Sequence, residues 1–386
     1  MLRKRGLLWV LMGSLLICGG CNDQYSANVT ETVTEEESTT ENTNPAVLSG
    51  VQTEDGSGTH AEYEVRLKKI DIDTLKNVLA QDKKVISNTT ENSVYGQESA
   101  EKVVFSDGSS ILTGWGTLEY STMEAQTRPP LGPFFEQEYK YYYFKNGPEE
   151  SLSHKNLSFM TLESAQTMVA SYLDTLKIGY GTKWISWSLD AETLTEMMVN
   201  RFPEDKYPGA TWNGWNKYYQ TGNDVYIFQI PLAVDGHVLT DAEYLLCSKS
   251  MDAAEVNYDS GCYARAMVGV DGLLYLSINK NVEVTVRNVE QSAIDSVEAQ
   301  KKSWEYILNT PALNYHAEND RLDEGAINFC YMPLLEHGEK EGEMYPCWEV
   351  CYEDAYGNNY RVNVDAITSE VRGYVAVHAS QDAYYQ

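Results

Sequence analysis

The sequence predicts an α+β fold in which antiparallel sheets each carry a helix packed on one face. Alternating apolar residues predict several strands, and Asp271-Gly272 marks a hairpin because this pair suits the positive φ values of a type I′ turn. Apolar residues also recur at helical spacing in 161–176 and in 292–308. Several strands follow each helix, so we expect two related helix-plus-meander units after a β-rich N-terminal part.

The N-terminal part, 59–150, contains mostly strand signals. A short helix is expected at 73–81, with Asp73 as its N-cap. Alternation and aromatic runs predict strands at 63–67, 103–105, 114–120 and 139–144.

The two helix-plus-meander units occupy 151–288 and 289–386. In the first unit, Thr161 suits the N-cap of a helix that ends at Gly179. The other elements expected in this unit are a helix at 190–199 and strands at 224–230, 263–270 and 273–278. In the second unit we expect the helix at 292–308, strands at 326–335, 347–352 and 360–364, and a charged loop at 337–343.

The first 20 residues have the zones of an export signal. Three basic residues precede an apolar run at 7–17, which is shorter than the roughly 20 residues that a membrane-spanning helix needs. Gly19 and Gly20 then precede Cys21. This pattern resembles the lipobox of bacterial lipoproteins, which implies that Cys21 carries the lipid, including palmitate, after signal cleavage. Lipidation at Cys18 and an uncleaved anchor helix are the alternatives.

Residues 21–58 are expected to form a disordered acidic tether. They contain mainly Thr, Glu, Asn, Ser and Gly, with very few large apolar side chains. Such a segment cannot bury enough apolar surface to offset its chain entropy. The order of signal, Cys21, tether and folded body therefore predicts a protein anchored to the cell membrane through its lipid and facing outside.

The end of the chain carries a second resemblance. The stretches Pro346-Cys347-Trp348-Glu349-Val350 and 364–371 resemble the closing hairpin of PepSY-type domains, which pair a helix with a strand that ends in a "vDa.tGev" turn. Ser369 stands where that turn usually has Gly. The doubled layout after a lipid anchor is also similar to extracellular regulators of the Gram-positive cell-wall sensor kinase and to clostridial surface lipoproteins. The resemblance implies a non-catalytic role at a protein partner.

The composition excludes nucleic acid as a partner. The formal net charge is −28 at pH 7, and no basic patch interrupts it, so nucleic acid phosphates would be repelled. An anionic membrane surface would be repelled too, which leaves the lipid as the anchor. The partners that remain are a protein of the cell envelope and a cell-wall glycan.

Five cysteines lie in the body of the chain, an odd number that cannot pair completely within one molecule. They are Cys247, Cys262, Cys330, Cys347 and Cys351. Cys247 and Cys262 are candidates for a disulfide, and Cys330 faces Cys347 or Cys351 across the expected hairpin. The alternative is that all five are small buried apolar residues. No His or further Cys has metal-ligand spacing, so we expect neither a metal site nor a cofactor.

Catalytic motifs are missing from the sequence, and we expect no enzyme. There is no HExxH, no GxSxG and no phosphate-binding glycine loop. Ser277 and Lys280 fit the S-x-x-K pattern, but they fall at the end of an expected strand rather than at the start of a helix. The six histidines are scattered and are interpreted as solvated or hydrogen-bonded side chains.

Trp212, Trp215 and Tyr218 form the most suggestive binding patch, because aromatic rings beside amides are suited to stacking on sugars. The alternative is that these rings pack back onto the sheet. Two functions therefore remain. The first is a non-catalytic, lipid-anchored protein that binds or regulates an envelope protein; the second is a surface lipoprotein that binds a glycan or a small solute.

Overall fold

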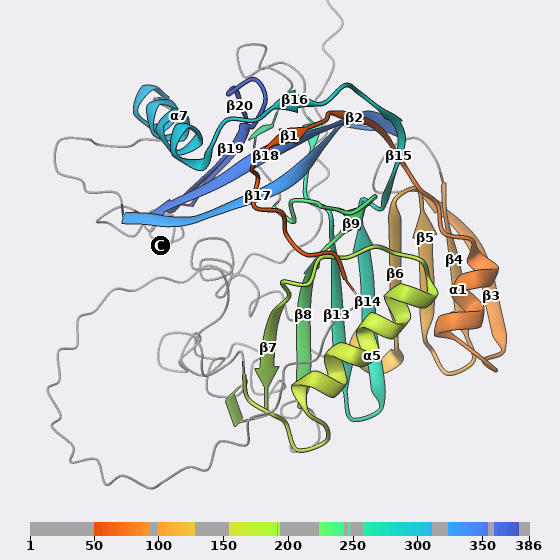
Figure 1. Cartoon of the computed structure of the whole chain (residues 1–386). Helices are drawn as coiled ribbons and strands as arrows, with labels where there is room; N and C mark the ends of the chain where they lie inside the picture. The colour runs from red at the N-terminus through yellow and green to blue at the C-terminus, as the bar shows by residue number, and fades with distance from the viewer. Residues whose placement is uncertain are drawn as a thin grey trace, which may run out of the picture.

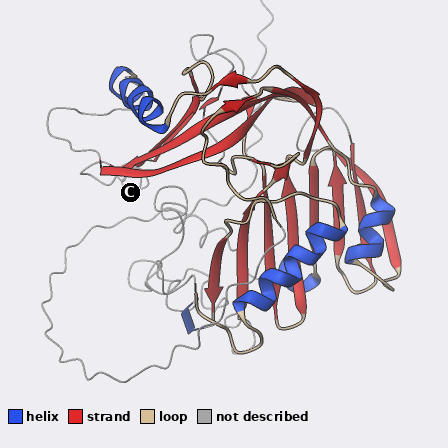
Figure 2. Ribbon diagram, in the orientation of Figure 1, coloured by secondary structure: helices blue, strands red, loops and turns tan. Residues whose placement is uncertain are grey.

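Two antiparallel sheets with helices packed on their faces form the body of the protein (Figures 1 and 2), which confirms the expected α+β class. A computed structural model describes residues 50–92, 99–127, 154–190, 192–193, 224–242, 246–247, 258–310, 323–353 and 359–377. The predicted strand at 139–144 and most of the predicted helix at 190–199 lie outside these residues.

The first sheet has eight strands in the order β3-β4-β5-β6-β14-β13-β8-β7. Every neighbouring pair is antiparallel. The strands are β3 (Val85–Asn92), β4 (Ser99–Phe105), β5 (Ser110–Gly114), β6 (Thr117–Ser121), β14 (Gly272–Asn279), β13 (Tyr263–Gly269), β8 (Val225–Pro231) and β7 (Ile185–Leu189). The predicted hairpin joins β13 to β14, but its turn is not of type I′. Gly269 pairs with Gly272, and of Asp271 and Gly272 only Gly272 has a positive φ, at +98°.

The second sheet runs β11-β20-β19-β18-β17-β12, and β2 joins it by pairing with both β18 and β15. Its strands are β11 (Leu246–Cys247), β20 (Val371–Val377), β19 (Asn359–Asp365), β18 (Glu341–Glu353), β17 (Asp323–Glu336), β12 (Tyr258–Asp259), β2 (Tyr63–Leu67) and β15 (Val282–Arg287). Two further pairs are short: β1 (Thr59–His60) with β16 (Gln291–Ser292), and β9 (Ala233–Val234) with β10 (His237–Val238).

The helices begin at polar caps. In α5 (Leu162–Thr175) the Thr161 side chain accepts from the backbone N–H of Ser164, as predicted, but the helix ends before Gly179. In α7 (Ser296–Asn309) the cap is Asp295. In α1 (Ile72–Leu79) it is Asp71, and the expected cap Asp73 lies in the first turn instead. Helix α2 (Met123–Thr127) was not predicted.

Apolar side chains cover both faces of the first sheet. One face packs with α1 and α5 in a large cluster that contains Tyr226, Phe228, Val169 and Leu173. The opposite face contributes to a second cluster together with the β17, β18 and β20 strands of the other sheet. Helix α7 covers β18, β19 and β20 (Figure 1), where Trp348 donates to the backbone carbonyl of Ile294. The two sheets therefore share apolar contacts.

Strands from the expected N-terminal part belong to both sheets. β6 pairs with β14, which extends the first sheet, and β2 pairs with β15 and β18 in the second. Strands on both sides of the expected boundary at 150 thus lie in one sheet. The residues 50–58, expected to belong to the tether, contact the body instead: the backbone of Val51 bonds to Tyr180 and Thr182.

The turn after β19 is held by the side chain of Asp365. Asp365 accepts hydrogen bonds from the backbone N–H groups of Ile367 and Thr368 at 2.7 and 2.9 Å. Ser369, in the place of the usual Gly, has a φ of +61°, in the left-handed region that Gly favours. The expected loop at 337–343 is shorter in the structure, because β18 already begins at Glu341.

Candidate functional site

The region where the two sheets meet is the candidate site, and residues 50–58 run through it. The segment starts beside the first sheet at Tyr180 and ends at Gly58, whose carbonyl accepts from the backbone N–H of Ala293, just after β16. Gly56 lies against the rings of Trp348 and Phe329, and a Cβ atom there would be 2.5 Å from a Trp348 ring carbon. The chain can cross at this point only because Gly56 has no side chain.

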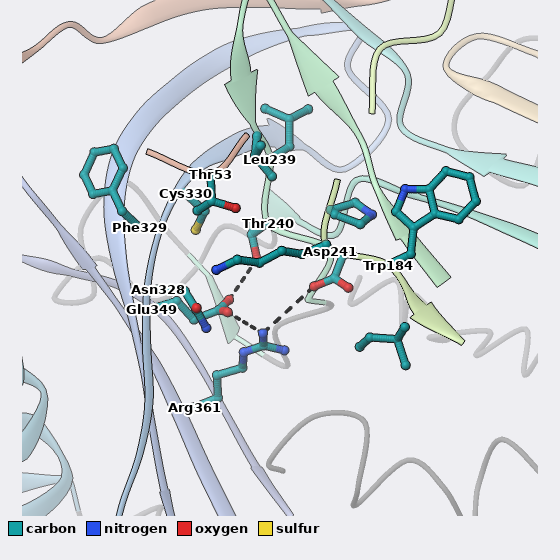
Figure 3. A pocket seen from close by; sticks show the side chains of 14 residues that line it. Thr53, Trp184, Leu239, Thr240, Asp241, Asn328, Phe329, Cys330, Glu349 and Arg361 are labelled. Carbon is teal, nitrogen blue, oxygen red and sulfur yellow. Dashed lines mark hydrogen bonds and ion pairs between the residues drawn. The ribbon is translucent and has the colours of Figure 1, made fainter. Parts of the chain in front are cut away.

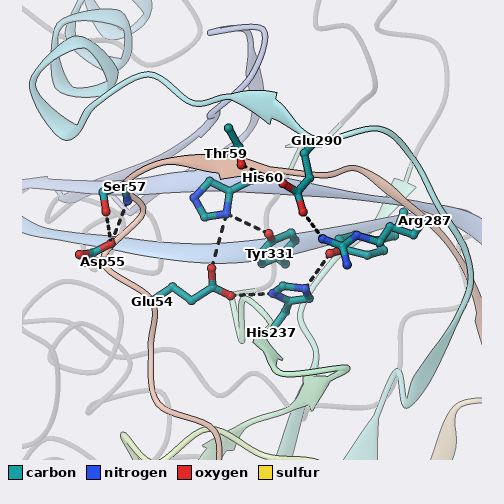
Figure 4. Close-up of polar contacts among 10 residues, drawn as sticks. Glu54, Asp55, Ser57, Thr59, His60, His237, Arg287, Glu290 and Tyr331 are labelled. Carbon is teal, nitrogen blue, oxygen red and sulfur yellow. Dashed lines mark hydrogen bonds and ion pairs between the residues drawn. The ribbon is translucent and has the colours of Figure 1, made fainter.

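A polar cluster holds this segment in place (Figure 4). The Glu54 carboxylate lies 2.6 Å from His237 Nδ1 and 3.4 Å from His60 Nδ1. A carboxylate only accepts hydrogen bonds, so His237 donates through Nδ1, and its Nε2 lies 2.7 Å from the Tyr63 hydroxyl. Burial and the negative charge of Glu54 raise the pKa of Tyr331, whose hydroxyl is 3.1 Å from His60 Nδ1.

Next to this cluster lies a pocket of about 290 Å³ between the two sheets (Figure 3). Its lining comes from the 50–58 segment, from β7, β8 and β10 with the residues that follow β10, and from β17, β18 and β19. Its apolar side is formed by Trp184, Ile185, Pro231, Val238, Leu239 and Phe329. Its polar side is formed by Thr53, Lys183, Thr240, Asp241, Asn328, Glu349 and Arg361, and Cys330 completes the lining.

Charged side chains at the pocket are fixed in position. Arg361 forms an ion pair with Glu349 and lies 3.9 Å from Asp241. The side chains of Arg361, Glu349 and Asp241 are only 8, 5 and 16% exposed. Thr240 donates to Glu349 at 2.9 Å, and its hydroxyl accepts from the N–H of Ala242. Because these groups hold one another, they present donors and acceptors to the pocket without first having to reorganise.

The Trp184 ring on the apolar side of the pocket is also fixed in position. The indole N–H of Trp184 donates to the carbonyl of Gly181 at 2.8 Å, and its ring meets Tyr180 and Phe228 edge to face. A half-buried indole fixed in this way offers a flat apolar surface beside the charged groups. Together the two sides suit a small ligand with both polar and apolar parts.

The structure tests some of the residues that the sequence singled out and does not describe the others. Cys21 and the patch of Trp212, Trp215 and Tyr218 lie outside the described residues, so lipidation and stacking stay predictions. Cys247 and Cys262 are both buried and belong to different apolar clusters, and the disulfide considered for them is not formed in the structure. Cys330 lies directly opposite Cys347, whereas Cys351 lies opposite Arg361.

Sequence reasoning missed the charged groups of the pocket. Glu349 and Arg361 stand in the largely apolar strands of 347–352 and 360–364, and a charge in a strand that is buried on both faces is a signal for a polar site. Asp241 and Thr240 follow the short strand β10 and carry no comparable signal.

No group of three or more His, Cys, Asp or Glu side chains is placed to hold a metal ion within the described ranges. Among these same residues, no helix is long and apolar enough to cross a membrane.

Comparison with known proteins supports the fold only. No family model matches the chain, and no curated protein matches it. A crystal structure at 1.45 Å resolution of an uncharacterized protein from Eubacterium rectale is similar, with a TM-score of 0.53 and 13% identity over 81% of this chain and 86% of the other. The C-terminal domain of YpeB from Bacillus megaterium aligns over 81% of this chain and 99% of its own, at 9% identity. Its TM-score of 0.30 is too low to support a conclusion.

Proposed function

We propose that this protein is a non-catalytic lipoprotein, anchored by Cys21 to the outer face of the cell membrane, that binds a small polar solute or the end of a glycan between its two sheets. The observation that carries the binding proposal is the pocket, with Trp184 on one side and the Arg361–Glu349 ion pair on the other. The export signal and lipobox pattern before Cys21 support the location.

Several features of the pocket favour a ligand of this class. Asn328 and Thr53 place an amide and a hydroxyl in the lining, and Lys183 adds an exposed ammonium group. The two cations and two carboxylates of the lining balance formally, so a neutral or zwitterionic ligand is favoured over a highly charged one. The volume of about 290 Å³ is suited to one or two sugar or amino-acid units rather than to a folded partner.

The binding proposal is tested by a thermal unfolding screen of the full mature protein. The probes are N-acetylglucosamine, soluble peptidoglycan fragments and the twenty amino acids. A ligand that binds only the folded state stabilises it by about 2.7 kcal/mol at a concentration 100 times its Kd. We expect at least one probe to raise the Tm, and no change with any probe would contradict the proposal.

The anchor is tested separately by Cys21→Ala. This variant should leave the precursor uncleaved by the lipoprotein peptidase, and metabolic labelling with palmitate should be lost. Efficient release of a mature chain without lipid would contradict the anchoring proposal. A Cys18→Ala control should keep the label.

A second candidate function is binding to an envelope protein, and strand β3 favours it. Within the described residues β3 ends the first sheet, and its Val85 and Ile86 are 41 and 62% exposed. An exposed edge strand with apolar residues can pair with a strand of another protein. A photo-crosslinker at position 86 should then capture one membrane protein, and a crosslinker at Val289, which is 81% exposed elsewhere, should not.

A further inference from the structure

Cys330 and Cys347 occupy directly opposite positions on the neighbouring strands β17 and β18. Opposite residues of an antiparallel pair project from the same face of the sheet. The two thiols are therefore neighbours, although they are 17 residues apart in the chain. Cys351, on the same face of β18, is opposite Arg361 and has no cysteine as its cross-strand partner.

Opposite residues of an antiparallel pair are either hydrogen-bonded to each other or not, and neighbouring backbone hydrogen bonds show which kind Cys330 and Cys347 form. The carbonyl of Tyr331 accepts from the backbone N–H of Thr240, so it points to the side of β17 away from β18. The carbonyl of Pro346 accepts from the backbone N–H of Ala366, so it points to the side of β18 away from β17. Successive residues of a strand point their N–H and C=O groups to alternate sides. The backbone groups of the adjacent Cys330 and Cys347 therefore face each other, as in a hydrogen-bonded pair.

The geometry of such a pair is compatible with a disulfide. Its Cα atoms lie about 5.5 Å apart, within the range of about 4.4–6.8 Å found across disulfides. Its Cβ atoms are typically about 4.5–5.5 Å apart, whereas a disulfide needs about 3.5–4.5 Å. Bond formation therefore requires the two strands to approach by about 1 Å at this point, and such a distortion makes a disulfide easier to reduce.

From this register we propose that Cys330 and Cys347 form a reversible cross-strand disulfide when the protein meets a small disulfide outside the cell. Cys330 lines the pocket between the sheets, so its sulfur is the one that a small oxidant reaches first. The Cys330 thiolate attacks the oxidant and releases one thiol, and Cys347 then attacks the mixed disulfide and releases the second thiol. Two protons leave the protein thiols and end on the two released thiols.

The surroundings set the rate of this reaction. Burial and the nearby charge of Glu349 raise the pKa of Cys330, and burial and the charge of Asp365 raise that of Cys347. The thiolate is the reacting form, so oxidation is slow at neutral pH and becomes faster as the pH rises. Because Cys330 belongs to the pocket lining, the crosslink also alters the shape of that lining.

The test is oxidation of the folded full-length mature protein with 2-hydroxyethyl disulfide, followed by denaturation, alkylation and non-reducing tryptic peptide mapping. Cleavage after Lys340 separates Cys330 from Cys347, but Cys347 and Cys351 stay on one peptide. The variants Cys347→Ser and Cys351→Ser resolve this ambiguity. We expect a crosslinked pair of peptides in the wild type and in Cys351→Ser, and its loss in Cys347→Ser.

Three results would overturn the proposal: persistence of the crosslink in Cys347→Ser, its loss in Cys351→Ser, or a dominant Cys247–Cys262 crosslink. Full recovery of five alkylated thiols after prolonged oxidation at pH 9 would overturn it as well. Circular dichroism of each variant before oxidation shows whether it is folded. The proposal takes the outside location from the proposed function. None of these readouts requires the lipid anchor or a pocket ligand, so failure of the crosslink and failure of the proposed function are distinguishable.

Discussion

Asp365 and Arg372 form a buried ion pair across the turn that joins β19 to β20. Oδ2 of Asp365 accepts from Nε and Nη2 of Arg372 at 2.9 and 2.7 Å, and the side chains are 0 and 6% exposed. The same carboxylate caps the turn by accepting from two backbone N–H groups. One side chain thus fixes both the turn and the first part of β20.

Removal of the Asp365 charge should therefore lower the free energy of unfolding strongly. In Asp365→Asn the Arg372 charge stays buried with a weaker partner, and breaking a buried pair in this way costs about 3–5 kcal/mol. Glu370→Gln is the matched control, because Glu370 also contacts Arg372, at 3.4 Å, but is 59% exposed. We expect the control to lose less than about 1 kcal/mol in urea unfolding. Equal losses in the two variants would contradict this account of the turn.

Ser369 in the same turn should be replaceable by Gly. A left-handed φ costs a residue with a side chain about 1–2 kcal/mol, and the extra freedom of Gly in the unfolded chain costs about 0.5–1 kcal/mol. Ser369→Gly should therefore raise the free energy of unfolding by up to about 1.5 kcal/mol. Ser292→Gly, in the exposed strand β16, should lower it instead. A loss of stability in Ser369→Gly would show that the Ser side chain has a role in the turn.

Gly56 and Gly58 provide a matched pair for the segment that crosses between the sheets. Both have positive φ, at +73 and +95°, but a Cβ on Gly56 would meet Trp348 whereas a Cβ on Gly58 would meet nothing within 4 Å. Gly56→Ala should displace the segment and make 50–58 sensitive to limited proteolysis. Gly58→Ala should show only a modest loss of stability, from backbone strain. Similar proteolysis of both variants would mean that contact with Trp348 does not hold the segment.

Asp107 should give a pH dependence of stability at acid pH. Burial raises the pKa of Asp107, but hydrogen bonds from Lys83 and Ser109 outweigh this effect and lower it to about 2. A carboxyl group whose pKa is lowered in the folded state contributes stability above its unfolded value of 3.8, and the contribution is lost as the pH falls towards 2. Asp107 is 47% exposed, so solvent screening reduces the contribution to less than about 1 kcal/mol.

This dependence is measured by comparing Asp107→Asn with the wild type in urea at pH 6 and at pH 2.5. The difference in unfolding free energy between the two proteins should be larger at pH 6. A difference that stays constant with pH would show that the charge of Asp107 does not contribute.

The fold class was predictable because the helix and strand patterns are local. Thr161 as an N-cap and Asp271-Gly272 as a hairpin both follow from side-chain or backbone preferences within a few residues. The cap of α1 was assigned wrongly because Asp71 and Asp73 are both good caps, and only the hydrogen bond to Thr74 distinguishes them. Sheet partners distant in the chain were not predictable, unlike the hairpin partners. The pairing of β6 with β14 joins residues about 160 positions apart and leaves no mark in either strand.

The candidate site depends on the same long-range contacts. Glu349 and Arg361 could have been noticed as charges within largely apolar strands. Their further partners, Thr240 for Glu349 and Asp241 for Arg361, come from a segment more than 100 residues earlier. Glu54 lies in a stretch whose composition predicts a tether, and its contacts with His60 and His237 appear only when both sheets are assembled. Composition describes whether a segment can form a core of its own, and not whether it can pack on a core formed by others.

Isothermal titration of the pocket tests the central claim of ligand binding between the sheets most directly. The titrant is the probe that raises the Tm most in the thermal screen, and the proteins are wild type, Asn328→Ala and the control Asn288→Ala. Asn328 lines the pocket, whereas Asn288 is exposed beyond β15. We expect Kd to rise about tenfold in Asn328→Ala, the effect of one lost hydrogen bond of roughly 1.4 kcal/mol, and to stay unchanged in the control. Equal affinity in all three proteins would contradict binding in this pocket.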